Sequence, residues 1–534
     1  MDNKRQAGGF AFGRGFDFVL KVLSDLPVIE NLYHKLYNTA LMGSKSIYLG
    51  IDLGTSTIKG LAMADDGQVL ANFLKETPMV SRQIDWVEQS PEFWWSSLLE
   101  IVNLLKTKVD LKQVKGVGLS GQMHGLVAYD SHFHALRRAI IWMDKRSSAE
   151  VEIILKTFGV KFYQITGNPV FTGFLLPSLL WLKKHEPNIY QKIHQISSPK
   201  DYLACRLTGV LRTEPTDALA TACFDYHKNT WSDKILSAFK LKRSLFPLIR
   251  PTLEPYGGIS EPIAKITGIP AQTLIFGASD QAMSAMGTGL IKPGQASIAI
   301  STGGQFLVTA PQGLVDPQRR LHTLNHAFPD IGLYMAATLS AGFSLRWFKD
   351  LVCEQKETGF KKFTEGIAKI NPGADGLIFL PFLSGERTPY FNPSLRAAFI
   401  GLSQIHKKLH LARAIIEGVS FSMAECLEVF KKLKLPVNKV ILSGGGAQNP
   451  VWRQILADVL NLPMKTINIA DHSPFGAAVL AKFAQAGLEK LPAFYKKVIT
   501  PIDYLYPHEK NVQIYQGLFS HYKKLSQCMI SLGK

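Results

Sequence analysis

The sequence predicts an α/β protein with two large domains, and three observations lead to this prediction. The chain has 534 residues, far more than a single hydrophobic core holds. Strand-like and helix-like stretches alternate from Ile47 to about Gly289, which is typical of α/β proteins. The plan of Ile47–Gly60, an apolar strand, a turn of small residues and a second strand, recurs at Ala296–Val308. We therefore infer a duplicated α/β unit with one such hairpin in each half.

Composition favours a folded protein of a reducing compartment. Apolar residues make up 46% of the chain, which is typical of globular proteins. The sequence has no uncharged apolar stretch long enough to span a bilayer and no secretory layout at its start, so we expect no membrane association. The five cysteines have no CxxC spacing, so neither a zinc site nor a disulfide framework is expected. We expect a cytoplasmic protein.

The net charge of +18 raises the question of an anionic partner. The lysines are scattered, often as pairs such as Lys183–Lys184 and Lys431–Lys432, and no basic stripe with interleaved aromatic residues is present. The charge therefore predicts a solvated basic surface with a general attraction for anionic substrates, and no nucleic-acid partner.

Residues 1–45 are predicted to be an N-terminal extension without a catalytic role. The apolar residues there have helical spacing interrupted by Pro27, which favours two short amphipathic helices. Met42 stands just before the first core strand, so a translation start at that position is an alternative. The remaining chain divides into predicted domains at 46–290 and 291–534, with Pro293–Gly294 as linker.

The elements of the first domain follow from composition in order along the chain. Residues Pro91–Val109 are predicted to form a helix, with proline near its start as helix N-termini favour. The strands are expected at Ile47–Asp52, Gly60–Ala64, Val114–Ser120 and Leu126–Tyr129.

The first hairpin carries a carboxylate beside a turn of hydroxyl residues. Asp52 ends the apolar strand, the chain turns at Gly54, and Thr55 and Ser56 follow. Backbone N–H groups in such a turn can bind a phosphate, and the carboxylate can hold Mg²⁺ through water. An ordinary structural hairpin is the competing interpretation. Two further glycine-rich turns, in ISTGGQF and ILSGGGAQNP, favour a nucleotide held between two lobes.

Two motifs follow strand-like runs and offer polar side chains. Asp280 comes after TLIFGAS and before a helix rich in small residues, where it could orient a hydroxyl group and accept its proton, or simply cap the helix. His124, in QMHG, follows VKGVGLS; a lone histidine there is more often structural than a ligand contact.

Taken in order, nine motifs between Ile47 and about Gln485 resemble the FGGY family of carbohydrate kinases, most closely its xylulose-specific branch. The motifs are GIDLGTS, DWVEQSPEFWW, GLSGQMHGLVAYD, ITGNP, SSPKDYLACRLTG, GASDQAMSAMG, FLPFLSGERTPYFNP, FIGLSQIHKKLHLARAIIEGV and SGGGAQNPVWRQILADVL. The resemblance implies an actin-like ATPase fold, with two RNase H-like domains around a cleft for nucleotide and sugar. It also implies transfer of phosphate from ATP to O5 of D-xylulose.

The resemblance further implies a role for each matching residue. Asp280 matches the catalytic base, and Asp52 the carboxylate that holds Mg²⁺ through water. The sugar side is assigned to Gln122, Met123, His124 and Gly125 and, near the same pocket, to Trp142, Asp144 and Arg146. The nucleotide and its phosphates are assigned to Thr55, Ser56, Thr302, Gly303, Gly304, Gly444, Gly445, Gly446 and Asn449.

Departures from the family pattern keep other functions open. They include Ser178 in place of lysine, Met143 and Gln281 in place of asparagine, and Ser279 in place of glycine. The acceptor could then be ribulose, glycerol or gluconate. A degenerate sugar-binding regulator and a nucleotide-driven conformational protein are the alternatives of other classes, because actin-like proteins share this architecture. The assembly could be a homodimer, as related enzymes often are.

Overall fold

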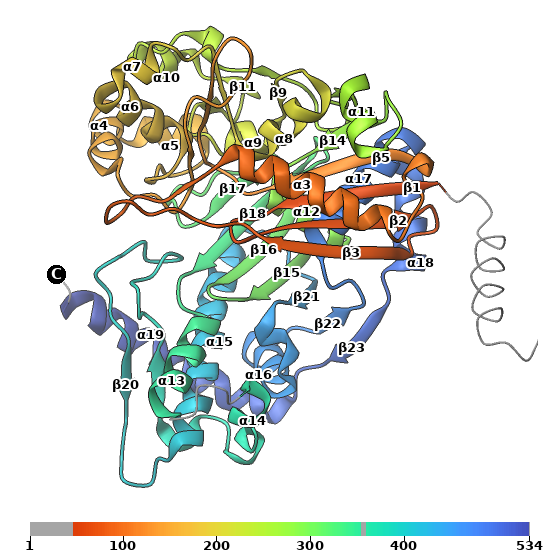
Figure 1. The fold of residues 1–534 in the computed structure, drawn as a ribbon. Helices are drawn as coiled ribbons and strands as arrows, with labels where there is room; N and C mark the ends of the chain where they lie inside the picture. The colour runs from red at the N-terminus through yellow and green to blue at the C-terminus, as the bar shows by residue number, and fades with distance from the viewer. Residues whose placement is uncertain (1–45, 354–358, 533–534) are drawn as a thin grey trace, which may run out of the picture. The chain divides into compact units, whose positions relative to one another are not determined.

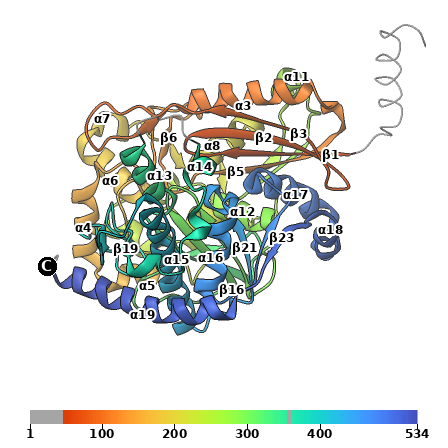
Figure 2. The same ribbon diagram turned by 90° about the horizontal axis from the view of Figure 1, so that it is seen from below.

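Two mixed β-sheets organise the described part of the chain (Figures 1 and 2). The computed structural model describes residues 46–353 and 359–532, so the predicted helices before Ser46 lie outside the described residues. Residues from Ile47 onward pack as one compact unit that contains both sheets.

The first sheet has six strands in the order β13-β14-β5-β1-β2-β3. Its strands are β1 (Ile47–Leu53), β2 (Thr57–Ala64), β3 (Val69–Glu76), β5 (Val114–Gly121), β13 (Gly257–Gly258) and β14 (Leu274–Gly277). Strands β1, β2 and β3 form an antiparallel meander, whereas β5 and β14 run parallel to β1.

The second sheet repeats this plan with one additional strand, in the order β17-β18-β16-β15-β21-β22-β23. Its strands are β15 (Gln295–Ile300), β16 (Gly304–Pro311), β17 (His322–Asn325), β18 (Ile331–Thr338), β21 (Lys439–Ser443), β22 (Met464–Ile467) and β23 (Pro501–Leu505). Antiparallel β15, β16 and β18 correspond to β1, β2 and β3, and parallel β21 and β22 correspond to β5 and β14. Each first hairpin closes through three residues, 54–56 and 301–303. The predicted duplication of the α/β unit is confirmed at the level of strand order.

Long helices cover the sheets. Helix α3 (Pro91–Lys106) begins where predicted, with the Ser90 side chain accepting a hydrogen bond from the Phe93 N–H, and ends three residues before the predicted Val109. Between β5 and β14 the first half holds a layer of shorter helices. These are α4 (Ser148–Phe158), α5 (Val160–Thr166), α6 (Leu175–His185), α7 (Pro187–Tyr190), α8 (Pro199–Thr208), α9 (Pro215–Leu219), α10 (Asp233–Ala238) and α11 (Glu261–Thr267).

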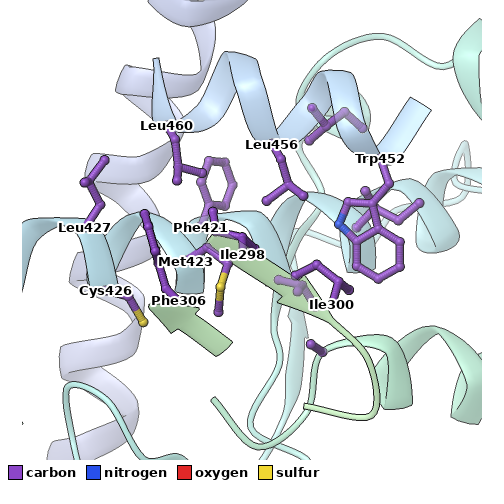
Figure 3. Packing of buried hydrophobic residues seen from close by; sticks show 14 of the residues in the cluster. Ile298, Ile300, Phe306, Phe421, Met423, Cys426, Leu427, Trp452, Leu456 and Leu460 are labelled. Carbon is purple, nitrogen blue, oxygen red and sulfur yellow. The ribbon is translucent and has the colours of Figure 1, made fainter. Parts of the chain in front are cut away.

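The core of the second half lies between its sheet and three helices. Strand β15 presents Ile298 and Ile300 to α15 (Lys408–Lys432) and α16 (Pro450–Leu460), and Figure 3 shows Met423 and Trp452 packed against them. Helix α19 (Glu509–Leu532) completes the layer through buried tyrosines. Burial of these large apolar side chains is the main stabilising term for this half.

One helix of the second half packs on the sheet of the first half. Helix α17 (His472–Ala486) lies against β1 and β5 and beside α12 (Asp280–Thr288). A Cβ on Gly50 would lie 1.7 Å from the Pro474 carbonyl oxygen, and a Cβ on Gly118 would lie 1.8 Å from that of Ala477. Glycine normally weakens a strand, but here it allows the helix backbone to approach.

The sequence predictions of elements agree with the structure to within a few residues, and the predicted actin-like pair of RNase H-like domains is confirmed. Pro293–Gly294 stand directly before β15, and the Gly294 N–H donates to the Thr309 carbonyl. The boundary between 290 and 291 stays a prediction. Within the described ranges, the search for a helix long and apolar enough to cross a bilayer finds none.

Candidate active site

The first turn, residues 54–56, is held by contacts from three directions. Ser120, opposite Asp52 in the β1–β5 register, donates its hydroxyl to Asp52 Oδ1 at 2.7 Å. The Thr55 carbonyl accepts from Gln89 Nε2 at 2.7 Å and from Thr77 Oγ1 at 2.9 Å. A turn with this many side-chain bonds presents its backbone in one conformation, as anion binding by N–H groups requires.

Trp142 joins the first turn to the predicted sugar side. Its indole Nε1 donates to Thr55 Oγ1 at 2.8 Å, although 87 residues separate the two in sequence. The structure thus brings together one residue assigned to phosphate and one assigned to sugar. Ser56 is exposed beside them.

Asp280 is the first residue of α12, and its carboxyl group has an unusual environment. Ser279 occupies the N-cap position, so Asp280 is not the residue that caps the helix. Asp280 is partly exposed, yet its Oδ1 is buried without a hydrogen-bond partner among the described residues. Burial, and next the negative charge of Asp52, raise the pKa of Asp280 to about 7. A carboxyl group with this pKa can exchange a proton near neutral pH.

A buried polar network fixes the backbone just before Asp280. The Thr216 hydroxyl accepts from the Ser279 N–H at 2.7 Å and donates to Glu214 Oε1 at 2.8 Å. Glu214 belongs to a fully buried group around Lys200, whose Nζ lies 2.6 Å from Asp201 Oδ1. These residues hold Asp280 in place. The sequence analysis did not predict this network, although Lys200 and Asp201 stand in the motif SSPKDYLACRLTG.

Asp52 has the chemistry expected of a carboxylate that holds Mg²⁺ through water. Burial raises its pKa, while the bond from Ser120 and the charge of Lys59 act to lower it. A search of the described residues for three or more clustered metal-ligating side chains finds no such group. A cation beside Asp52 would therefore be coordinated mainly by water and phosphate, which suits Mg²⁺. The residues present fit this ion.

His124 presents one ring nitrogen to its surroundings. Its Nδ1 lies 2.7 Å from the Ala220 carbonyl oxygen, which can only accept, so Nδ1 carries a proton. Burial lowers the pKa of His124 to about 4, so the ring is neutral and Nε2 is a hydrogen-bond acceptor. The ring stacks on Phe174 at 3.9 Å between centroids. Nε2 of His124 can thus accept a hydrogen bond from a sugar hydroxyl.

The neighbours of His124 are mainly buried. Gln122 donates from Nε2 to Gln89 Oε1 at 2.7 Å, and its own Oε1 is buried without a partner among the described residues. Met123 lies in the apolar cluster between the two halves. A Cβ on Gly125 would lie 3.0 Å from the Ile140 carbonyl oxygen, so the chain there is closely packed.

Asp144 and Arg146 are engaged with protein partners. Arg146 Nη2 lies 2.7 Å from Asp144 Oδ2, which also accepts from the Val87 N–H at 2.6 Å. The guanidinium stacks 3.8 Å from the Trp86 ring and reaches Glu88 at 2.9 Å. Both side chains are fully buried. Through these contacts Asp144 and Arg146 hold the DWVEQ segment in place. A direct contact of either side chain with sugar stays a prediction.

The second turn, residues 301–303, and the third, residues 444–449, abut each other. A Cβ on Gly444 would lie 2.5 Å from the carbonyl oxygen of Ile300, and one on Gly446 would lie 2.3 Å from Ile300 Cγ2. Gly445 is different, because a Cβ there would meet nothing within 4 Å. The third turn thus has a closely packed side and an open position.

Other residues of these turns have structural contacts. Asn449 caps α16, because its Oδ1 accepts from the N–H groups of Val451 and Trp452. A Cβ on Gly303 would lie 2.4 Å from the Thr338 carbonyl oxygen, and Gly304 begins β16. Thr302 is exposed. Binding of nucleotide by these residues stays a prediction.

The residues that depart from the family pattern lie around the same site. Ser279 and Gln281 flank Asp280, and Met143 is 40% exposed beside Trp142. Ser178 is different, because it is fully buried on α6 and its hydroxyl has no partner among the described residues.

The second half contributes residues near His124 that sequence reasoning missed. Burial lowers the pKa of His322 to about 3, and the charge of the nearby Arg387 lowers the pKa of both His322 and His124 further. The Arg387 guanidinium lies 6.0 Å from the ring of Phe171, which is stacked 6.1 Å from Phe391. Arg387 has no ion pair within 4 Å among the described residues. Arg387 stands in the motif GERTPYF, which is the part of the sequence that could have indicated its place at the site.

Comparisons by family, by sequence and by structure all match carbohydrate kinases. Residues 47–287 match the FGGY family of carbohydrate kinases, N-terminal domain, and residues 296–485 match its C-terminal domain. The xylulose kinase of Bacillus subtilis (strain 168) is 34% identical over 480 residues, covering 89% of this chain and 96% of the relative. A gluconokinase of the same organism is 26% identical over 496 residues, covering 91% and 96%. A xyloylose kinase structure from Brucella ovis has a TM-score of 0.86 at 28% identity, covering 91% and 100%.

Proposed function

The chain belongs to the FGGY family of carbohydrate kinases, and from this premise we propose that it phosphorylates D-xylulose with ATP to give D-xylulose 5-phosphate. The observation that carries the proposal is Asp280, a carboxyl group with a pKa of about 7 and an unpartnered buried oxygen. Kinase chemistry with a sugar hydroxyl needs a carboxylate of this kind.

Asp280 acts as the general base. Its carboxylate accepts the proton of the O5 hydroxyl as the oxygen attacks the γ-phosphorus of ATP, and ADP leaves with the electron pair of the broken bond. The bond from the Ser279 N–H to Thr216 fixes the backbone at the start of α12. A base held in this way needs little rearrangement to reach the transition state.

The sugar is held from both halves. Neutral His124 accepts a hydrogen bond from a sugar hydroxyl at Nε2, Gln122 offers its unpartnered Oε1 as a second acceptor, and Met123 supplies apolar contact. His322 and Arg387 face this region from the second half. Buried polar groups that each need a hydroxyl partner discriminate strongly against analogues that lack that hydroxyl.

The nucleotide lies across the turns. Backbone N–H groups of the first and second turns bind phosphate oxygens, with Thr55, Ser56, Thr302, Gly303 and Gly304 as the residues involved. Asp52 would hold Mg²⁺ through water, and this cation supplies charge neutralisation of the phosphates. The open Gly445 would lie against the purine, with Gly444, Gly446 and Asn449 shaping the turn.

Coupled ADP release tests the proposal. The full chain would be assayed with Mg-ATP and D-xylulose, L-xylulose, D-ribulose, glycerol or gluconate, with Asp280→Asn as the control. We expect turnover with D-xylulose that is lost in the variant. Turnover with another acceptor only would refute the choice of sugar, and ATP binding without turnover on any sugar would favour a regulator.

Gluconate is the second candidate acceptor, and Arg387 is the observation that favours it. A partly buried guanidinium without an ion pair in the described chain could bind a substrate carboxylate. Gluconate turnover in the panel, with KM raised at least tenfold by Arg387→Gln, would support this candidate. D-Xylulose turnover with little response to gluconate would exclude it.

A cytoplasmic location and a homodimeric assembly remain proposals. All five cysteines are unpaired in the structure, as expected in a reducing compartment. Light scattering of the purified chain would measure the assembly.

A further inference from the structure

A cavity lies between the two halves, and none of the residues assigned to the candidate active site lines it. Its volume is about 600 Å³. The first half lines it with Pro215, with the loop between β10 (Phe224–Asp225) and β11 (Thr230–Trp231), with Arg243 and with residues 248–253. The second half lines it with Gln312–Gly313 and residues 325–329. Strand β16 starts at the second turn and ends at Pro311, immediately before this cavity. Eight residues of strand span roughly 25 Å, which separates the cavity from the second turn. None of the residues assigned to the reaction lines the cavity, although His322 lies three residues from its lining residue Asn325 on β17.

The cavity wall is cationic. It contains Arg243 and Arg250, whereas no aspartate or glutamate is among its lining residues. The Arg243 guanidinium donates from Nη1 to the Phe246 carbonyl at 3.0 Å and has no ion pair within 4 Å among the described residues. The charge of Asp233 acts on it from outside the wall.

Arg250 is also incompletely satisfied. Its Nε is buried and finds no hydrogen-bond partner in the described chain. The nearest carboxylate is that of Glu254, 3.5 Å from Nη1, but both side chains are about half exposed and such a pair is weak. The exposed Arg243 and the half-exposed Arg250 can therefore offer Nη donors to an anion in the cavity, whereas the buried Arg250 Nε does not face it.

The rest of the wall selects the kind of anion. Asn229, Thr230 and Gln312 supply amide and hydroxyl groups, and Phe328 offers a partly exposed ring. The volume lies in the range of organic ligand sites and is many times the roughly 30 Å³ that a water molecule occupies in the liquid. Inorganic phosphate alone would leave most of the cavity to water.

We propose that this cavity binds a phosphorylated sugar or polyol, with Arg243 and Arg250 on the phosphate and the amide groups of both halves on the hydroxyls. Such a ligand would bridge the two halves, since it would contact Arg243 and Arg250 of the first half and Gln312 of the second half. The proposal goes beyond the kinase reaction, because it uses none of the residues assigned to that reaction.

Isothermal titration of the full chain tests the site, with D-ribose 5-phosphate as probe. D-Ribose is the matched probe without a phosphate, and inorganic phosphate tests for a site that binds any small anion. D-Xylulose 5-phosphate tests whether the proposed reaction product also binds in the cavity. The double variant Arg243→Gln/Arg250→Gln removes the two charges. The matched control, Lys431→Gln/Lys432→Gln, removes two exposed charges at the end of α15, outside the cavity.

We expect D-ribose 5-phosphate to bind at least tenfold more tightly than D-ribose or inorganic phosphate. The arginine variant should weaken this binding about tenfold or more, and the lysine control and Asp280→Asn should leave it unchanged. Equal binding of inorganic phosphate, competition by D-xylulose or Mg-ATP, or full binding by the arginine variant would each overturn the proposal. If the glutamine variant does not fold, Arg243→Ala alone gives the same comparison. Failure of kinase turnover would not affect this result.

Discussion

The two halves share a strand order but differ in the residues at the ends of equivalent strands. In the first half Asp52 lies opposite Ser120 in the β1–β5 register, and in the second half Ala299 lies opposite Ser443 in the β15–β21 register. After β5 the chain continues as Gln122-Met123-His124, and after the equivalent β21 it continues as Gly444-Gly445-Gly446. The duplicated backbone therefore supplies two similar sites, and single side chains decide their chemistry.

The starts of helices α12 and α17 show the same contrast between carboxylates. Asp471 occupies the N-cap position of α17 without a side-chain capping bond, and its carboxylate accepts from Lys59 Nζ at 2.6 Å and from Asn72 Nδ2 at 2.5 Å. These partners outweigh burial and lower the pKa of Asp471, whereas burial and Asp52 raise that of Asp280. Of these two carboxyl groups only Asp280 can take up a proton near neutral pH, which supports its proposed role as the base.

Replacing each of these two aspartates by asparagine is the strongest test of the contrast between the unpaired Asp280 and the paired Asp471. We expect Asp280→Asn to lower kcat about 10³-fold, since a general base contributes 10²–10⁴-fold. Asp471→Asn should lower kcat less than about tenfold but lower the melting temperature, because it breaks a partly exposed ion pair. Coupled ADP release and thermal melting measure both effects. Equal losses of kcat in the two variants would show that the absence of partners does not distinguish Asp280 from Asp471 in catalysis.

The hairpins and turns were predictable from sequence because they depend on neighbouring residues. The strand from Ile47 and the turn at Gly54 follow from local composition, and the three-residue turns were found at the right places. Packing of α17 on the first sheet was not predictable, because it joins Gly50 to Pro474. Arg387 was missed for the same reason: its position near His124 exists only after the two halves have packed together.

The third turn offers the next test, because the second half has bare backbone where the first half has side chains. Gly445→Ala adds a methyl group where nothing of the protein lies within 4 Å, so the fold should be unaffected. If the purine lies there, KM for ATP should rise about tenfold, equivalent to about 1.4 kcal/mol. Gly517→Ala, also in open space, is the matched control. An unchanged KM for ATP would exclude a purine contact at Gly445.

The two equivalent serines give a smaller effect. Ser120 donates to Asp52, whereas Ser443 lies 3.5 Å from the Ile298 carbonyl oxygen and faces no carboxylate across the strand pair. We expect Ser120→Ala to raise the Mg²⁺ concentration for half-maximal activity about threefold to tenfold, because one charge-assisted hydrogen bond that orders Asp52 is lost. Ser443→Ala should leave that concentration within twofold. A larger effect of Ser443→Ala would show that the metal lies nearer the second half.

The smallest effect concerns buried carboxyl groups that the second half uses for packing. Burial raises the pKa of Glu425 to about 8 and that of Glu386 to about 7, and the Tyr390 hydroxyl donates to Glu425. Between about pH 4.5 and 8 the folded chain therefore holds protons that the unfolded chain has released, so the free energy of unfolding falls as pH rises through this window. We expect the melting temperature of the wild-type chain to fall from pH 5.5 to 8.5.

The variant Glu425→Gln isolates the contribution of Glu425 to the pH dependence of the free energy of unfolding. Glutamine resembles the protonated side chain, so the variant should match the wild type at pH 5.5 and exceed it at pH 8.5, by an amount on the order of a few kcal/mol at most. Differential scanning fluorimetry at the two pH values measures the difference. The exposed Glu509→Gln is the matched control and should show no pH-dependent gain. A variant less stable than the wild type at pH 8.5 would show that the folded chain stabilises the ionised form of Glu425, so that the pKa of Glu425 is not raised and burial alone does not separate the packing acids from Asp280.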